Sequence, residues 1–133
     1  MGSVRVERTE DGFVARNDRG GEIVMATGDG LFSPLELLLA AVGGCNIMTV
    51  EPLTAQRGHR LVRLAVDVTA EKAAPTLLRS VTVTYDVELP SEESREVFEA
   101  VAERVHERHC TVSRSLAAGT EVRLELPPSA PQA

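Results

Sequence analysis

The chain has 133 residues, 43% of them hydrophobic and 26% charged, which is typical of one globular domain rather than of a disordered or fibrous protein. A formal net charge of −6 and a near absence of aromatic residues argue against binding to nucleic acid by phosphate contacts or base stacking. The start lacks the apolar run of a secretory signal, so we expect a cytoplasmic protein whose two cysteines form no permanent disulfide.

The first expected elements are three short strands. Residues 4–8 alternate apolar and charged side chains, and the turn at Asp11-Gly12 leads to a second strand-like run at 13–16. Asp-Gly between two such runs is a strong hairpin signal. A third strand is expected at residues 22–26.

The clearest helix start in the chain is Ser33-Pro34. Ser is favoured at the N-cap, Pro at the first helical position, and Glu36 stands where a capping box needs its carboxylate. The run 35–50 is apolar on nearly all sides, which favours a buried helix over a membrane span. We expect Pro52 to kink or end this helix.

Two longer strands are expected next, and they give the chain an α+β character. Residues 61–68 and 81–89 alternate with a period of two and are rich in β-branched side chains. Both features predict an antiparallel pair. A second helix is expected after residues 90–93, with apolar side chains at a spacing of four: Val97, Val101 and Val105.

The C-terminal part is expected to hold a short helix and one more strand. Residues 112–118 predict a turn of helix that stops at Gly119, and residues 120–126 alternate again as a strand would. We expect one domain over residues 1–126, followed by a flexible Pro-rich tail over residues 127–133.

Cys45 follows two glycines inside an otherwise apolar helix. A lone buried cysteine usually behaves as a small hydrophobic residue. Gly43 and Gly44, however, each cost a helix about 1 kcal/mol relative to Ala. This cost indicates that another helix, or a substrate, approaches the backbone closely at this point.

Cys110 lies in a polar and basic stretch, so it is either an incidental exposed thiol or a reactive one. Arg108, His109 and Arg114 would favour its thiolate, which is the form that attacks peroxides. One thiol among packed helices and one among cations suit a nucleophile with a resolving partner.

Other kinds of site have weaker support. His106 and His109 could join the two cysteines in a metal site, but the spacing matches no zinc signature. The sequence carries no common phosphate-binding or hydrolase motif, so we expect no metal and no cofactor. His59 stands beside a glycine, and we expect it on the surface.

Two separated segments resemble the cysteine motifs of the OsmC/Ohr family: residues 33–45 (SPLELLLAAVGGC) and residues 109–116 (HCTVSRSL). The order of the expected elements over about residues 4–126 is similar as well. The resemblance implies an OsmC-like fold, in which curved antiparallel sheets surround two long central helices of an intertwined homodimer.

The resemblance also implies a function, that of a thiol-dependent hydroperoxide reductase. Cys45 would attack an organic or inorganic hydroperoxide, and Cys110 would resolve the resulting sulfenic acid as a disulfide. A thiol or dithiol reductant, such as a lipoylated protein, would recycle the pair.

The catalytic carboxylate and arginine of the family are less directly matched. The family's glutamate position is Leu35 here, and Glu36, the candidate catalytic carboxylate, is turned from it by about 100°. The family's arginine comes from the early strands, where the candidates are Arg8, Arg16 and Arg19.

Two rival interpretations stay open. The same dimer could hold a small apolar or thiol-containing ligand between its helices without turnover, and Leu35 in place of a carboxylate favours this alternative. The chain could also be a purely structural domain whose glycines serve helix packing alone.

Overall fold

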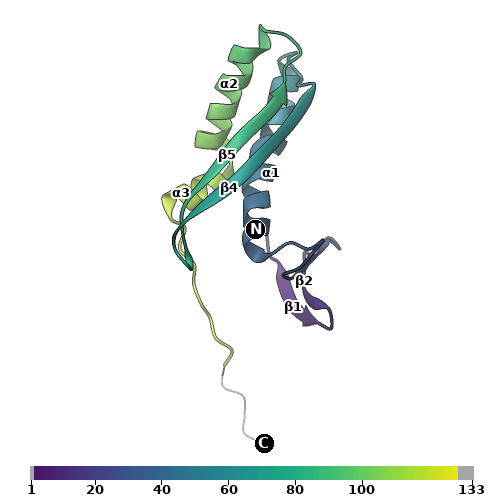
Figure 1. The fold of residues 1–133 in the computed structure, drawn as a ribbon, viewed down its shortest axis with the longest axis vertical. Helices are drawn as coiled ribbons and strands as arrows, with labels where there is room; N and C mark the ends of the chain where they lie inside the picture. Colours follow the sequence, from purple (N-terminus) through teal and green to yellow (C-terminus); the bar gives the residue numbers. More distant parts are fainter. Residues whose placement is uncertain (1, 129–133) are drawn as a thin grey trace, which may run out of the picture.

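The structure is a computed structural model that describes residues 2–128. It has an α+β architecture: an N-terminal three-stranded sheet, one long helix, a long β-hairpin and a group of shorter helices (Figure 1). The predicted fold class is thereby confirmed.

The N-terminal sheet contains three antiparallel strands in the order β1-β2-β3. Strand β1 is Arg5–Thr9, β2 is Gly12–Arg16 and β3 is Glu22–Met25. The predicted Asp-Gly hairpin is present, and Gly12 adopts a φ of +142°, a conformation that L side chains rarely take. Sequence alternation and turn chemistry therefore identified all three strands.

Helix α1, Pro34–Gln56, begins with the predicted capping box. Ser33 Oγ accepts the Glu36 backbone N–H at 3.2 Å, and Glu36 Oε1 accepts the Ser33 backbone N–H at 2.9 Å. Of the two outcomes expected at Pro52, a kink or an end, the end is excluded, because the helix continues to Gln56 and has its C-cap at Arg57. Pro52 removes the hydrogen bond to the carbonyl of Met48, a residue on the exposed side of the helix, and the Thr54 hydroxyl donates to the carbonyls of Val50 at 3.2 Å and Glu51 at 3.1 Å in the same turn.

The second sheet is the hairpin of β4, Arg63–Ala74, and β5, Leu77–Glu88, which are antiparallel as predicted and longer than predicted. Helix α1 packs against β4. Gly43 lies at this contact, because a Cβ there would be 2.8 Å from Val68 Cγ2 and 3.1 Å from Val66 Cγ2.

The C-terminal helices follow in close succession. Helix α2 is Ser94–Arg104, the π-helix η1 is Val105–His109, and α3 is Thr111–Ala118. Both predicted helices are present, and α3 ends at Gly119 with a φ of +73°. The π-helix was not predicted. Its wide turn is closed by a 2.7 Å hydrogen bond from Cys110 N–H to the Val105 carbonyl.

The predicted strand over residues 120–126 is not formed. The segment extends away from the helices (Figure 1), and its apolar side chains are solvent-exposed: Val122, Leu124 and Leu126 at 93%, 83% and 78%. A strand needs a neighbouring strand for its hydrogen bonds, and the segment has none within the described part of the chain. Of the predicted tail, residues 129–133 lie outside the described residues.

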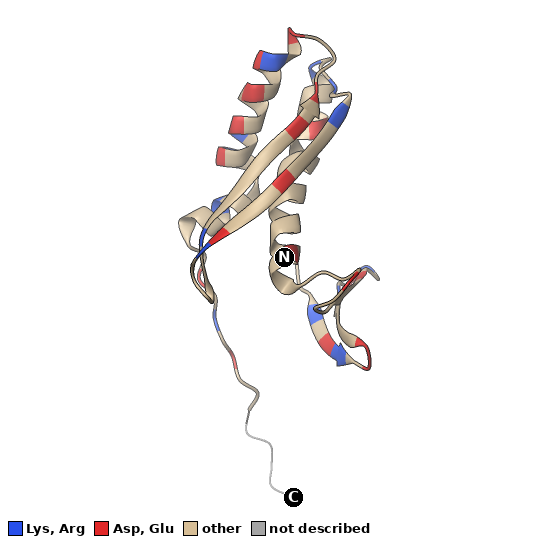
Figure 2. Cartoon of the chain, viewed as in Figure 1, with Lys and Arg blue, Asp and Glu red and all other residues tan. Residues whose placement is uncertain are grey.

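The buried core lies where α1, α2 and η1 meet the hairpin. Its members are Val50, Leu61, Phe98, Val101, Val105 and Cys110. Charged residues are frequent along α2 and in the N-terminal sheet, while α1 carries few (Figure 2). Helix α1 is long and apolar enough to cross a membrane, but here it packs on the hairpin and on α2.

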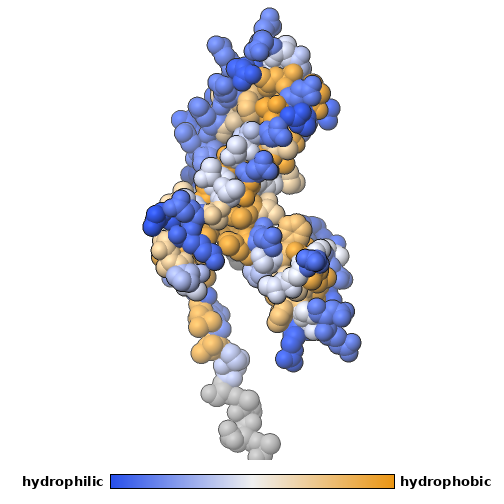
Figure 3. All heavy atoms as spheres, in the orientation of Figure 1, coloured by the Kyte–Doolittle hydropathy of each residue, from blue (hydrophilic) through white to orange (hydrophobic). Residues whose placement is uncertain are grey.

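Much apolar surface is left uncovered. The N-terminal sheet makes no extensive contact with any other element over residues 2–128. The accessible surface is 10399 Å², compared with about 6,800 Å² for a compact monomer of 14.3 kDa. Apolar surface is visible along the middle of the molecule and on the C-terminal segment (Figure 3).

Candidate functional site

The fold brings Cys45 and Cys110 together. Cys45 comes from the middle of α1, and Cys110 from the junction between η1 and α3. Both are free thiols, and Cys45 packs against the core cluster that contains Cys110. The two side chains lie close enough for each thiol to shift the pKa of the other.

The two thiols differ in access to solvent. Cys45 is half-buried, whereas Cys110 is fully buried with no exposed surface. A small oxidant from solvent would therefore meet the sulfur of Cys45 first. Of the two alternatives for Cys110, an incidental exposed thiol or a reactive one, the burial of Cys110 excludes the first.

The thiols also differ in pKa. Burial raises the pKa of Cys45, and the neighbouring Cys110 raises it further. Burial raises the pKa of Cys110 too, but hydrogen bonds from the Cys45 thiol and from the hydroxyl and N–H of Ser113 outweigh it and leave that pKa lowered. The negative charge of a singly ionised pair therefore resides on Cys110.

The cause of the lowered pKa differs from the predicted one. Arg108, His109 and Arg114 are all exposed, and the groups that stabilise the Cys110 thiolate are hydrogen-bond donors. The Cys110 sulfur is also the N-cap of α3, because it accepts the Ser113 backbone N–H at 3.3 Å.

A buried amide connects α1 to this cap. Asn46, directly after Cys45, is fully buried, and its Nδ2 donates to the Val42 carbonyl at 2.8 Å and to Ser113 Oγ at 3.0 Å. Asn46 and Ser113 were not identified as site residues from the sequence. The available signals were a polar side chain inside an apolar helix and a hydroxyl three residues after Cys110.

Glu36 lies far from the thiols within the chain. It is exposed, and its carboxylate caps α1; the hydrogen bonds from the Ser33 backbone N–H and hydroxyl lower its pKa. It precedes Cys45 by nine residues, which is about 13 Å of helix and two and a half turns. The two side chains therefore leave α1 on opposite faces.

The three candidate arginines lie in the N-terminal part of the chain: Arg8 on β1, Arg16 on β2, and Arg19 in the turn between β2 and β3. Arg16 pairs with Glu7 at 3.6 Å and with Glu22 at 3.5 Å, while Arg8 and Arg19 are exposed. Because this sheet makes no extensive contact with α1 or α3 over the described residues, the structure does not bring these arginines to Cys45 within one chain.

The histidines take separate positions. His59 is half-buried rather than on the surface, and its Nδ1 lies 2.7 Å from the buried Ser94 Oγ, which joins the end of α1 to the start of α2. His106 and His109 are exposed on η1, whereas Cys110 points into the core.

Comparison with protein families gives one assignment. The profile of the family described as OsmC-like protein matches residues 27–125. An uncharacterized protein of Mycobacterium tuberculosis is 30% identical over 133 residues, covering 95% of this chain and 96% of the relative.

Comparison with solved structures gives the same fold. An OsmC-like protein from Mycoplasma pneumoniae has a TM-score of 0.71 at 19% identity, covering 90% of this chain and 89% of that one. The organic hydroperoxide resistance protein OhrB of Bacillus subtilis has a TM-score of 0.56 at 21% identity, covering 96% and 98%. This likeness concerns the fold alone.

Proposed function

The chain belongs to the OsmC-like protein family, and on that premise we propose that it is a cysteine-dependent hydroperoxide reductase. Membership of this family and the hydroperoxide-resistance proteins among its structural neighbours support a redox role at the level of the family. The observation that carries the finer proposal is the pairing of a half-exposed thiol with a buried one of lowered pKa.

The proposed first step takes place at Cys45. The Cys45 sulfur attacks the distal peroxide oxygen, the O–O bond breaks, and the S–H proton passes to the adjacent Cys110 thiolate. The alkoxide leaving group takes up a proton from water and departs as the alcohol. Cys45 is thereby oxidised to sulfenic acid, and the peroxide is reduced.

The second step uses Cys110 as the resolving thiol. Its sulfur attacks the Cys45 sulfur, an S–S bond forms, and the hydroxide that leaves combines with the Cys110 proton as water. The lowered pKa of Cys110 supports this role, because the thiolate is the attacking form. An external thiol or dithiol, in the reducing cytoplasm that we expect for this protein, returns both cysteines to thiols.

A homodimer is part of the proposal. Its support is the exposed N-terminal sheet, the exposed segment at 120–126, and the open space beside Gly44 on α1, where a Cβ would meet nothing within 4 Å. In a dimer, an arginine or Glu36 of the second copy could approach Cys45. Within one chain none of them does.

The test is a count of free thiols after stoichiometric cumene hydroperoxide or hydrogen peroxide. We expect the wild type to lose both thiols as a disulfide, Cys110→Ser to give a trappable sulfenic acid at Cys45, and Cys45→Ser to react at least ten-fold more slowly. Two intact thiols after treatment, or equal peroxide consumption by Cys45→Ser, would refute the proposal.

A second candidate function is a non-catalytic dimer that binds a small ligand. The position of the Glu36 carboxylate, engaged in the helix cap and turned away from Cys45, favours it. Mass spectrometry of the purified protein under native conditions separates the two functions: a retained small molecule without any peroxide consumption supports the binding protein.

A further inference from the structure

Asn46 stands at a position of α1 where an amide is unfavourable. Its side chain is fully buried, one residue after Cys45, and its Nδ2 donates to the carbonyl of Val42 at 2.8 Å. A carbonyl only accepts, so this bond fixes the orientation of the amide. Oδ1 is then buried without a hydrogen-bond partner among residues 2–128, which destabilises a fold. An apolar side chain would suit this part of α1 better, so the explanation for the amide lies in its Nδ2.

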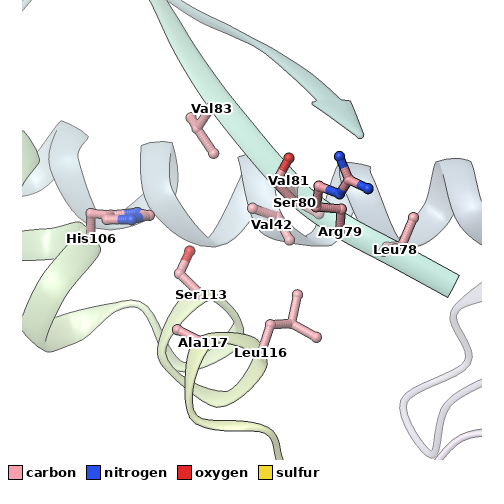
Figure 4. Close-up of a pocket in the computed structure, with 10 residues that line it drawn as sticks. All are labelled: Val42, Leu78, Arg79, Ser80, Val81, Val83, His106, Ser113, Leu116 and Ala117. Carbon is pink, nitrogen blue, oxygen red and sulfur yellow. The ribbon is translucent and has the colours of Figure 1, made fainter. Parts of the chain in front are cut away.

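The second hydrogen of Nδ2 is donated to Ser113 Oγ on α3 at 3.0 Å, between residues 67 positions apart. Figure 4 shows the Ser113 side chain directed from α3 toward α1. Because an amide NH2 group only donates, Ser113 Oγ is the acceptor in this bond. The hydroxyl hydrogen of Ser113 therefore does not point at Asn46 and is left for another acceptor.

The Cys110 sulfur is an acceptor beside that hydroxyl. It accepts the Ser113 backbone N–H at 3.3 Å, which places the two side chains next to each other in the first turn of α3. The Ser113 hydroxyl also lowers the pKa of Cys110. A hydroxyl has one hydrogen to donate, so its orientation decides whether the sulfur receives that hydrogen.

The Ser113 hydroxyl has other orientations available to it. Ser113 is half-buried and lines a cavity of about 360 Å³ between β5 and α3, together with Val42, Val83 and His106 (Figure 4). A serine hydroxyl beside such a space can rotate and donate to water instead. The hydrogen bond from Asn46 Nδ2 opposes this rotation, because it holds a lone pair of Oγ toward α1.

We propose that Asn46 is a positioning residue for the resolving thiol: its Nδ2 holds the Ser113 hydroxyl in the orientation that donates to the Cys110 sulfur. The inference rests on the proposed peroxide reduction and concerns its second step. There the Cys110 sulfur attacks the Cys45 sulfur, the S–S bond forms as the S–O bond breaks, and the leaving hydroxide takes up the Cys110 proton as water. The Ser113 hydroxyl keeps its hydrogen and stabilises the thiolate, and Asn46 acts only through Ser113.

The titratable side chains that interact with Cys110 include Cys45 on α1 and Tyr85 on β5. Burial raises the pKa of Tyr85 to about 12, so Tyr85 is neutral below that pH. His106 and His109 of η1 are exposed. A thiolate titration in the Cys45→Ser background therefore follows the Cys110 thiol.

The first experiment is this ultraviolet titration, without peroxide. Asn46→Leu keeps a branched side chain and removes the unpaired Oδ1 with the Nδ2 donor, so we expect it to fold and to raise the Cys110 midpoint by roughly 0.5–1 pH unit, the value of one hydrogen bond. Asn46→Ala, which adds no volume, is the second variant. In a Ser113→Ala background neither change should shift the midpoint further. Thr54→Val, which removes another buried hydrogen bond of α1, is the control and should leave the midpoint unchanged.

The second experiment follows disulfide formation at Cys45 and Cys110 as a function of pH, after one equivalent of cumene hydroperoxide. A thiol with a higher pKa is ionised to a smaller extent but attacks faster once ionised. Relative to wild type, Asn46→Leu should form the disulfide about two-fold more slowly below the midpoint and about two-fold faster well above it. A purely structural role of Asn46 would slow the reaction at every pH.

Four results would overturn the assignment: an unchanged midpoint in both Asn46 variants, equal shifts with and without the Ser113 hydroxyl, a rate reduced equally at all pH values, or failure of both variants to fold. The titration uses no peroxide, so its outcome is independent of the thiol chemistry. A shifted midpoint in a protein that consumes no peroxide would support the role of Asn46 at Cys110 and refute the proposed function.

Discussion

At the scale of single residues, the most informative feature is the environment of the Cys110 sulfur. A fully buried thiol normally resists ionisation, because burial disfavours the charged form. Here the donors of Ser113 and Cys45 reverse that effect. The reactivity of this pair therefore depends on hydrogen bonds at the start of α3 and not on the surrounding surface charges.

Replacement of Ser113 by Ala should raise the pKa of Cys110. The hydroxyl donor is lost while the backbone N–H stays, so the thiolate loses part of its stabilisation. Because the pKa of Cys110 is lowered on folding, this stabilisation is present at alkaline pH and disappears as the pH falls through the lowered pKa. Ser113→Ala should therefore lose more stability at alkaline than at acidic pH.

The measurement is the ultraviolet absorbance of the thiolate as a function of pH, together with thermal unfolding at the two ends of the range. Ser115→Ala in the same helix is the matched control, and its titration should follow the wild type. A Ser113→Ala midpoint at unchanged or lower pH would contradict the role given to the hydroxyl.

Sequence reasoning found the two cysteines but not what surrounds them. Their motifs identify Cys45 and Cys110 because each motif is local in the chain. Asn46 and Ser113 acquire a role only through a hydrogen bond between residues 67 positions apart, which no local pattern encodes. The basic neighbours of Cys110 misled the prediction, because adjacency in sequence does not place a side chain on the same side of the backbone.

At the scale of elements, α1 shows two neighbouring glycines with different environments. Gly43 is enclosed by β4, whereas Gly44 faces open space within the chain. The sequence predicted that another helix or a substrate approaches this pair, and this is wrong for the single chain, because the element that approaches is strand β4. The structure assigns the approach inside the protomer to Gly43.

Gly43→Ala should destabilise the fold by about 1–3 kcal/mol, the usual cost of an inserted methyl group in a packed contact. The new Cβ would lie 2.8 Å from Val68 Cγ2, closer than real Cβ atoms approach. Urea unfolding measures this loss. An unchanged midpoint would show that β4 can move away from α1 at little cost.

Gly44→Ala tests whether α1 packs against a second copy of the chain, because the expected effect differs between an isolated chain and the proposed dimer. Within one chain the new Cβ meets nothing within 4 Å, so helix propensity alone should add about 1 kcal/mol of stability. If a second α1 packs at this position, the same change should instead weaken the dimer. Sedimentation at several protein concentrations decides between the two outcomes.

The elements that were predicted correctly are those with local signals. The capping box of α1 and the Asp-Gly turn are defined within a few residues, and both are present. Residues 120–126 were predicted wrongly, and the effect of Pro52 was left open between a kink and an end, because both outcomes depend on neighbouring groups. A proline is tolerated where the freed carbonyl reaches water, and an alternating segment becomes a strand only beside another strand.

At the scale of the whole molecule, the most important feature is that the accessible surface of the single chain exceeds that of a compact monomer of the same mass. The exposed apolar residues lie on the N-terminal sheet, on α1 and on the C-terminal segment, including Phe13, Met48 and Leu124. Surfaces of this size are typical of chains that are stable only as oligomers. Periodicity in the sequence predicts which side chains are apolar, but not which molecule covers them.

If the proposed homodimer, with a mass of twice 14.3 kDa, is held together by this segment, Leu124→Asp should dissociate it. The residue is 83% exposed in the single chain, where a charge would cost almost nothing. Buried against a second copy, the carboxylate should weaken association at least ten-fold. Glu125→Ala is the control, and sedimentation equilibrium is the measurement. A dimer unaffected by Leu124→Asp would exclude this segment from the interface.

The Cys110 sulfur has two roles, and they couple the redox state of the thiol to the start of α3. The atom that would join a disulfide is also the acceptor that holds the first turn of α3, and a sulfur drawn toward α1 must release that turn. Oxidation of Cys110 would thus remove a hydrogen bond that holds the first turn of α3. The segment that follows α3 would then become more mobile, so that the redox state of the buried thiol affects the C-terminal part of the molecule.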